Sequence, residues 1–265
     1  HENIMNILVC VKPVPGTTKV NITPETNTLM RQGIENIMNP FDTYALEEGV
    51  RLKERFGGKV TVLSMGPPQA EAMLREAISC GADEAILIGD RAFAGSDTLA
   101  TSYTLSQAIK KIKDYDLIIC GRQTIDGDTA QVGPETSEML GIAFVSYVSK
   151  VEEISNGQMR VQRLIEEGHE IVETTLPALI TVVKEINVPR LPSLRGKTKA
   201  KSAVITNWDA PALDAEPDRL GLKGSPTKVV KIFSPQRTRT GEILQGSPEE
   251  QIASLIKKLK DSQLI

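Results

Sequence analysis

The chain has 265 residues, of which 40% are hydrophobic and 25% charged, the proportions of an ordinary globular protein. A net charge of −3 and only 4% aromatic residues argue against a nucleic-acid-binding protein, which needs a basic surface or stacking platforms. No apolar run approaches the roughly 20 residues that span a bilayer. The three cysteines, Cys10, Cys80 and Cys120, lie in apolar contexts without a C-x-x-C pair. We therefore expect a cytoplasmic protein with reduced core cysteines, no metal site and no membrane span.

The first half of the chain alternates short apolar runs with amphipathic segments. Strands are predicted at residues 6–11, 60–63, 85–88 and 117–120, and helices at 43–56, 69–79, 97–113 and 136–140. The segments 18–23 and 28–31 flank a turn sequence and predict a hairpin. Alternation of this kind predicts an α/β fold, a doubly wound and mostly parallel sheet with helices on both faces.

The second half has a different texture. Strands are predicted at residues 145–151, 159–166, 170–175 and 178–183, and the first three suggest a small antiparallel extension of the sheet. Residues 207–245 are rich in Pro, Gly and Asp and show little periodicity. The end is predicted to be a helix, with a capping box over 247–250 and an apolar stripe of Ile252, Leu255, Ile256 and Leu259. We therefore divide the chain into an α/β domain at residues 5–205 and an extended C-terminal arm at 206–265.

A glycine-rich loop, "GRQTIDGDTAQVGPE" at residues 121–135, joins a predicted strand to a predicted helix. In an open parallel sheet, ligands bind outside the carboxyl ends of the strands. Glycines expose backbone N–H groups, the following helix adds partial positive charge, and Thr124, Thr129 and Gln131 add neutral donors. This combination suits a pyrophosphate. A solvated turn that binds nothing is the alternative.

Three residues of this loop need a separate interpretation. Asp126 and Asp128 do not suit an anion site, and they would cap the turn or accept hydrogen bonds from ribose hydroxyls. Gly127, which lies between them, is predicted to adopt φ > 0 or to lie where a phosphate approaches the backbone. The sequence contains no G-x-G-x-x-G, no P-loop and no nucleophile–base pattern, which fits a protein whose chemistry belongs to a cofactor.

Several motifs resemble one family along nearly the whole chain. They are "ILVCVKPVPG", "NPFDTYALEEGVRLKE", "SMGPPQA", "GADEAILI", the glycine-rich loop, "EINVPRLPSLRGKTKAK" and "PQRTRTG". Together they resemble the β (small) subunit of electron-transfer flavoproteins, the EtfB/FixA family. The resemblance implies a Rossmann-like, adenine nucleotide α-hydrolase-like domain that pairs with a larger, FAD-carrying α subunit. It also implies that the β subunit holds either AMP or a second FAD.

The resemblance also implies which residues contact the nucleotide. Carried over residue by residue, the contacts fall at Cys10, Asn39, Pro40, Phe41, Asp42, Met65, Asp126, Gly127, Asp128, Thr129, Ala130, Gln131, Val132, Gly133, Pro134, Glu135, Thr136 and Ser137. The start of the glycine-rich loop adds Gly121, Arg122 and Gln123. These positions follow three predicted strands, where the fold argument independently expects a ligand.

The choice between FAD and AMP depends on "SDTLATS", residues 96–102, which the AMP-holding members lack. Those members also usually carry a bulkier, Asn- and Gln-rich stretch in place of "GDTAQVGPE". Thr98 and Thr101 would help a helix N-terminus bind a second phosphate; the alternative is that they cap the helix and face solvent. The pattern resembles the bifurcating members, in which a β-subunit FAD takes electrons from NADH. One electron then goes to ferredoxin or flavodoxin, and the other passes through the α-subunit FAD to an acyl-CoA dehydrogenase.

Two other functions stay open at this point. One is a non-bifurcating electron carrier whose β subunit binds AMP as a structural ligand, and the other is a free-standing nucleotide-binding regulator of the universal-stress type. The segment at residues 185–201 also has two interpretations, a Pro-stiffened surface loop or the family's docking loop for acyl-CoA dehydrogenases. In the second, Pro192, Ser193, Leu194 and Arg195 meet the partner, with Leu194 as the apolar anchor.

Overall fold

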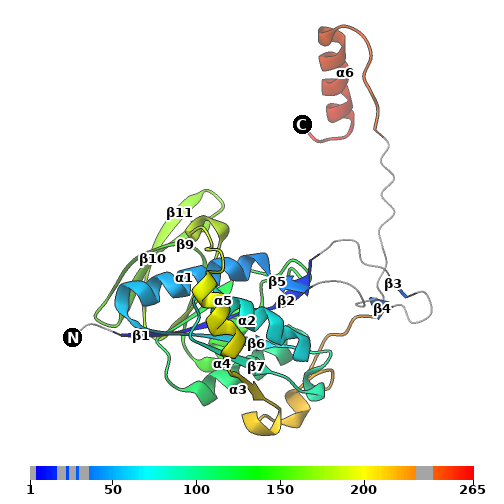
Figure 1. Ribbon diagram of the computed structural model, residues 1–265. Helices are drawn as coiled ribbons and strands as arrows, with labels where there is room; N and C mark the ends of the chain where they lie inside the picture. The colour runs from blue at the N-terminus through cyan, green and yellow to red at the C-terminus, as the bar shows by residue number, and fades with distance from the viewer. Residues whose placement is uncertain (1–3, 17–21, 24–27, 30–35, 231–240) are drawn as a thin grey trace.

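A single large sheet organises the chain (Figure 1). The computed structural model describes residues 4–16, 22–23, 28–29, 36–230 and 241–265, and all structural statements concern these residues. Among them, nine strands form one sheet in the order β11-β10-β9-β12-β8-β1-β6-β7-β13. The strands are β1 (Met5–Cys10), β6 (Gly58–Met65), β7 (Glu84–Ile88), β8 (Leu117–Gly121), β9 (Ala143–Ser155), β10 (Gln158–Ile165), β11 (Gly168–Thr175), β12 (Ala178–Val182) and β13 (Ile205–Trp208).

The strand pairing confirms the predicted fold class. All neighbours from β9 to β13 in the sheet order are parallel, whereas the pairs β9–β10 and β10–β11 are antiparallel. The sheet is therefore mostly parallel with a small antiparallel extension at one end. Parallel strands need crossover connections, and helices supply them here.

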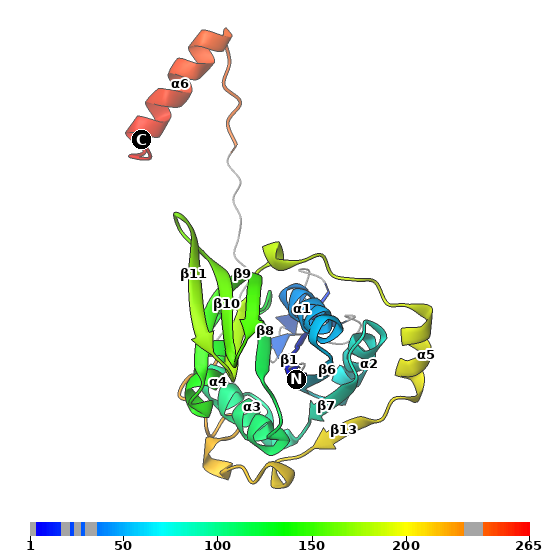
Figure 2. The ribbon, with the colours of Figure 1, turned by 90° about the vertical axis from the view of Figure 1, so that its left-hand side faces the viewer.

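Both faces of the sheet are covered by helices (Figure 2). In the central strand β1, Ile7 and Val9 pack into one core cluster with α1 and α2, whereas Leu8 packs into a second cluster with α3 and α4. These three side chains are at most 1% exposed. Successive side chains of a strand point to opposite faces, so a run of apolar residues is what a doubly covered strand requires.

Helices α1 and α4 begin earlier than the sequence pattern predicts, whereas α2 and α3 begin one or two residues later. The helices are α1 (Pro40–Phe56), α2 (Glu71–Ser79), α3 (Thr98–Ile112), α4 (Val132–Leu140), α5 (Leu194–Ser202) and α6 (Pro248–Asp261). Helix α1 starts with a proline, whose fixed φ suits the first helical position, and not at Thr43. Helix α4 starts at Val132 and not at Thr136, so the second half of the glycine-rich loop is helical. Its end at Gly141 (φ 66°) has the left-handed conformation that glycine adopts easily.

Short elements complete the description. The remaining strands are β2 (Pro13–Pro15), β3 (Ile22–Thr23), β4 (Thr28–Leu29) and β5 (Asn36–Met38), and the 3₁₀ turns are η1 (Pro68–Ala70), η2 (Arg91–Phe93), η3 (Lys184–Ile186), η4 (Pro211–Leu213) and η5 (Pro217–Arg219). Strands β3 and β4 pair antiparallel, as the predicted hairpin requires. The turn of that hairpin and residues 231–240, which hold most of "PQRTRTG", lie outside the described residues.

The C-terminal third differs from the prediction in two places. The segment at residues 185–201, interpreted as either a surface loop or a docking loop, contains most of α5, which packs on α2. Residues 205–208 form the edge strand β13. Strand β13 lies across the predicted boundary between residues 205 and 206. Helix α6 begins with the predicted capping box, in which Ser247 and Glu250 cap each other. No helix among the described residues is both long and apolar enough to span a membrane.

Candidate functional site

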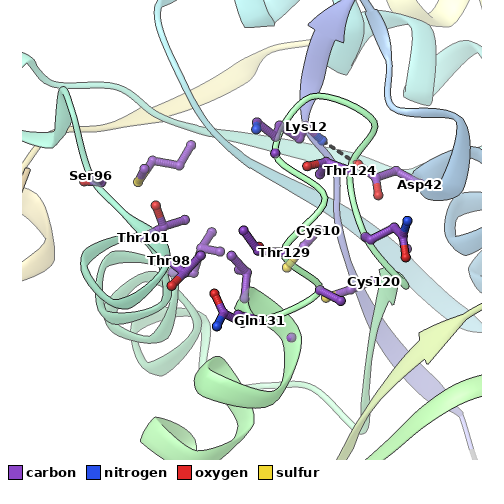
Figure 3. Close-up of a pocket in the computed structure, with 18 of the residues that line it drawn as sticks. Cys10, Lys12, Asp42, Ser96, Thr98, Thr101, Cys120, Thr124, Thr129 and Gln131 are labelled. Carbon is purple, nitrogen blue, oxygen red and sulfur yellow. Dashed lines mark hydrogen bonds between the residues drawn. The ribbon is translucent and has the colours of Figure 1, made fainter. Parts of the chain in front are cut away.

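A cavity of about 400 Å³ opens at the carboxyl ends of β1, β6 and β8 (Figure 3). From β1 the chain adds β6 and β7 on one side, and then returns to place β8 on the other side of β1. The point between β1 and β8 is thus the topological switch point, where doubly wound proteins bind ligands. Figure 3 shows Ser96, Thr98 and Thr101 on the α3 side of the cavity. The volume lies within the range of small-molecule sites.

The cavity brings together 14 of the 23 predicted contact residues. Those that line it are Cys10, Asp42, Met65, Thr98, Thr101, Gly121, Arg122, Gln123, Gly127, Thr129, Ala130, Gln131, Val132 and Gly133. The remaining candidates, which are Asn39, Pro40, Phe41, Asp126, Asp128, Pro134, Glu135, Thr136 and Ser137, are not part of the lining. Thr124, expected to donate to a phosphate, also lines the cavity. The sequence does not assign a binding role to the other lining residues, which are Val11, Lys12, Leu63, Phe93, Gly95, Ser96, Asp97, Leu105 and Cys120.

Two buried residues at the start of α1 join the strand ends around the cavity. The Asn39 side chain donates hydrogen bonds to Asp42 (2.9 Å) and to the Gln123 carbonyl (2.9 Å). It also accepts one from the Ile125 N–H (3.2 Å). Asp42 in turn accepts a hydrogen bond from the Lys12 N–H (2.8 Å). Asn39 and Asp42 therefore fix the loops after β1 and β8 to each other, and burial raises the pKa of Asp42 to about 7.

The glycines of the loop serve different needs. A Cβ on Gly121 would lie 2.4 Å from an Asp42 carboxylate oxygen and 2.7 Å from the Phe41 carbonyl carbon, so α1 can approach β8 only at a glycine. Gly127 does not adopt a left-handed φ, and that part of the prediction is wrong. The left-handed residues of the loop are Asp128 (φ 55°) and Ala130 (φ 56°). The protein atom nearest to a Cβ on Gly127 is the Thr124 hydroxyl oxygen at 3.5 Å, which leaves room on the cavity wall for a ligand.

Lys12, on the wall of the cavity, forms an ion pair with Asp126. The Lys12 ammonium bonds both carboxylate oxygens of Asp126, at 2.8 and 2.9 Å. Partial burial acts to raise the pKa of Asp126, but the hydrogen bond and charge of Lys12 outweigh it and lower this pKa. Asp126 therefore stays ionised and holds Lys12, where the sequence reasoning expected it to cap the turn or accept ribose hydroxyls.

Helix α3 meets α4 through a carboxylate. Glu135 accepts hydrogen bonds from the hydroxyls of Thr98 (3.1 Å) and Ser102 (3.0 Å) and so joins the two helices. Asp97 caps α3 by accepting from the Ala100 N–H (3.1 Å). Thr98 is thus partly committed to a structural contact, although both it and Thr101 line the cavity.

Two thiols form part of the floor of the cavity. Cys10 and Cys120 are register partners on the neighbouring strands β1 and β8, and both are free. The hydrogen bond with Cys10, and then burial, raise the pKa of Cys120, so this thiol is protonated at neutral pH. Among the described residues no group of three or more His, Cys, Asp or Glu side chains could hold a metal ion. The described side chains around the cavity suit it to binding a ligand.

The predicted docking residues lie apart from the cavity, because none of Pro192, Ser193, Leu194 or Arg195 lines it. Ser193 caps α5 by accepting a hydrogen bond from the Gly196 N–H (2.9 Å). Leu194, the first residue of α5, is 86% exposed. An aliphatic side chain this exposed at a fixed helix start is available to a partner.

The fold and the cavity define a doubly wound α/β protein with a ligand site at the switch point between β1 and β8. Residues 26–213 match the "Electron transfer flavoprotein domain". The chain therefore belongs to the electron-transfer flavoprotein family, and its relatives identify it as a β subunit of that family. Family membership sets aside the free-standing regulator of the universal-stress type.

Three relatives show how far this similarity extends. The chain is 51% identical to the electron transfer flavoprotein subunit beta of Thermoanaerobacterium thermosaccharolyticum, over 98% of this chain and 100% of the relative. It is 46% identical to the caffeyl-CoA reductase-Etf complex subunit CarD of Acetobacterium woodii, again over 98% and 100%. It is 47% identical to the protein FixA of Azotobacter vinelandii, over 91% of this chain and 89% of that protein.

Proposed function

We propose that this chain is the β subunit of a heterodimeric electron-transfer flavoprotein that binds FAD in the cavity and takes electrons from NADH. The larger α subunit carries a second FAD. One electron of each pair goes to ferredoxin or flavodoxin, and the other passes through the α-subunit FAD to an acyl-CoA dehydrogenase. CarD is named as part of a complex with a reductase of a CoA ester, which supports a partner of this class.

The donor set of the cavity fits a dinucleotide. Glycine backbone and the side chains of Thr129 and Gln131 border it on the α4 side, and Thr101 borders it at the N-terminus of α3. Two helix N-termini that face one cavity can each stabilise a phosphate. This single cavity, shared by α3 and the glycine-rich loop, is the observation that carries the proposal of FAD over AMP.

The residues of this chain bind and orient the cofactor. FAD, when bound, supplies the acceptor for a hydride and passes its electrons on singly. Asn39 and Asp42 hold the loops that surround it, and the small side chains at Gly127 and Ala130 let backbone approach a phosphate. Apolar residues such as Leu63, Met65 and Phe93 line the rest of the wall and exclude water.

The test is the cofactor content of the complex. Freshly purified αβ protein is denatured, and the released FAD and AMP are separated and quantified against protein. We expect two FAD per heterodimer. One FAD and one AMP would overturn the bifurcating function and support the non-bifurcating carrier. A parallel assay of NADH oxidation, with ferredoxin, an acyl-CoA dehydrogenase and its enoyl-CoA substrate present together, should show activity only in the two-FAD case.

A further inference from the structure

Lys12 is a cation on the wall of the cavity that the predicted contacts do not include. It follows β1 directly, and its backbone N–H is fixed by Asp42 at 2.8 Å. Its ammonium reaches across to Asp126 in the glycine-rich loop, 114 positions later in the sequence. The two side chains are 47% and 32% exposed. The ammonium is therefore positioned at the switch point by the fold but held there only by a partly solvated carboxylate.

The other charged residues of the lining are committed differently. Asp42 and Asp97 accept hydrogen bonds from protein donors. The guanidinium of Arg122 lies 5.1 Å and 5.7 Å from the centres of two aromatic rings, and its buried Nε has no hydrogen-bond partner among the described residues, so Arg122 has no carboxylate for a ligand to replace. An exposed ion pair contributes little to stability, so opening the pair between Lys12 and Asp126 costs little. Lys12 is the lining cation that can most readily change its partner.

We propose that Lys12 is a phosphate-binding residue of the cavity and that Asp126 holds its ammonium until a nucleotide phosphate replaces the carboxylate. This inference rests on the proposed function, in which the cavity binds an adenine nucleotide. The pyrophosphate of FAD as a whole, or the terminal phosphate of AMP, carries about two negative charges against the one of a carboxylate, and its oxygens form strong charge-assisted hydrogen bonds with an ammonium group. The position also fits, because Lys12 faces the loop whose glycines border the cavity.

If the proposal is correct, substitutions of Lys12 and Asp126 have different effects on the affinity for a phosphorylated ligand. Lys12→Met removes the phosphate partner and should weaken binding of a phosphorylated ligand. Asp126→Asn removes the competitor for the ammonium and should leave that binding unchanged or strengthen it. If the ion pair merely braced the loop, each variant would break the same brace, and both would weaken binding to the same extent.

These opposite effects are tested by calorimetric titration. The full chain is first freed of nucleotide and then titrated with AMP, FAD and adenosine. For Lys12→Met we expect at least about tenfold weaker binding of AMP and FAD, as loss of a charge-assisted contact implies, and less than about twofold change for adenosine. Lys12→Arg, which keeps the charge, should restore most of the affinity. Asp126→Asn should bind AMP at least as tightly as the parent chain. Lys59→Met is the matched control, because Lys59 pairs with Glu84 (3.2 Å) with similar exposure at the opposite ends of the strands.

The results that would overturn the role of Lys12 differ from those that would overturn the proposed function. Unchanged AMP affinity in Lys12→Met, or equal losses in Lys12→Met and Asp126→Asn, would overturn the role of Lys12 and leave the nucleotide site intact. A parent chain that binds neither AMP nor FAD would overturn the proposed function together with this inference. Circular dichroism and thermal unfolding establish that each variant is folded before it is titrated.

Discussion

The ionisable carboxyl group of Asp42 is almost completely buried at the edge of the cavity. Its residue is 5% exposed, and burial is the main cause that raises its pKa from 3.8 to about 7. The folded chain therefore retains a proton that the unfolded chain releases across this interval. The stability that this proton contributes is fully present below about pH 4 and is lost as the pH rises through 7.

Asp42→Asn should remove this pH dependence. The free energy of unfolding of the parent chain, relative to the variant, should fall between pH 5 and 7 by up to about 1.4 kcal/mol per pH unit. Urea denaturation at pH 5, 6, 7 and 8 measures it. Asp90→Asn is the control, because backbone hydrogen bonds lower the pKa of Asp90 and its contribution is lost only in more acidic solution. Parallel curves for the parent and Asp42→Asn would contradict the assignment.

Two glycines of the loop should respond differently to the same added methyl group. Gly121→Ala forces a Cβ against Asp42 and the Phe41 backbone, and overpacking of this kind costs about 1–3 kcal/mol of folding free energy. Gly127→Ala meets open space on the protein side, so the free energy of unfolding should change by less than about 0.5 kcal/mol. If a phosphate approaches the backbone at Gly127, that variant should instead bind nucleotide about tenfold more weakly.

Thermal unfolding without nucleotide and titration with FAD, both on the two variants, separate these effects. A Gly127→Ala chain that is folded and binds FAD as tightly as the parent would count against a phosphate at this position. For Gly121→Ala, by contrast, the part of the protein that folds should bind FAD as tightly as the parent chain, because the predicted effect of this variant is on folding stability.

At the scale of single elements, the sequence pattern predicts strands better than helix starts. Strands β1 and β8 are continuous apolar runs that only a doubly covered sheet explains. Strand β13 escapes prediction because it is a four-residue edge strand with two exposed central residues. Helix α5 escapes because its stabilising contacts are tertiary, such as the hydrogen bond from Arg75 to the Ala200 carbonyl (2.7 Å).

For the cavity, the location is predictable from the sequence, whereas the side-chain pairings around it are not. Fold rules locate it at the ends of three strands, and the family resemblance supplies many of its residues. The pairing of Lys12 with Asp126 joins two chain segments through a side-chain contact that no local pattern encodes. The role of Glu135 as a link to α3 depends equally on where Thr98 and Ser102 come to lie.

The segment before α5 is held rigidly on α1. Arg190 pairs with Glu47 (2.8 Å) and Glu54 (2.6 Å), and Asn187 donates to the Tyr44 carbonyl (3.0 Å). Leu194, just beyond these contacts, is 86% exposed. An exposed apolar side chain on a segment whose backbone is already ordered requires less ordering on docking, and this favours a role in partner binding.

Leu194→Ala should slow electron transfer from the αβ complex to an acyl-CoA dehydrogenase by about tenfold at low partner concentration, the loss typical of a small hot spot. Flavin content should be unchanged, because the residue is not part of the cavity. Stopped-flow reduction of the dehydrogenase flavin measures the rate. Val204→Ala is the matched control, with equal exposure of 86% beyond the end of α5. Lost flavin, or equal rates in both variants, would exclude docking through Leu194.

At the scale of the whole molecule, the described residues form a sheet with its own core, and α6 lies outside that core (Figures 1 and 2). The domain places two core clusters on the two faces of the sheet. Helix α6 has no buried residue, and its apolar side chains Ile252, Leu255 and Ile256 are 58%, 48% and 42% exposed. An amphipathic helix in this state is suited to packing on another chain, and we propose the α subunit as that chain.

A double substitution, Ile252→Ala with Leu255→Ala, should therefore separate assembly from folding. Alanine preserves the helix, and the loss of two aliphatic side chains from an interface should weaken association with the α subunit at least about tenfold. The unfolding temperature of the β chain alone should stay within about 2 °C, because these side chains contribute no buried core. Lys257→Ala, on the polar side of α6, is the control and should assemble normally. Sedimentation of the mixed subunits measures the association, and full assembly of the double variant would show that the stripe does not contact the α subunit.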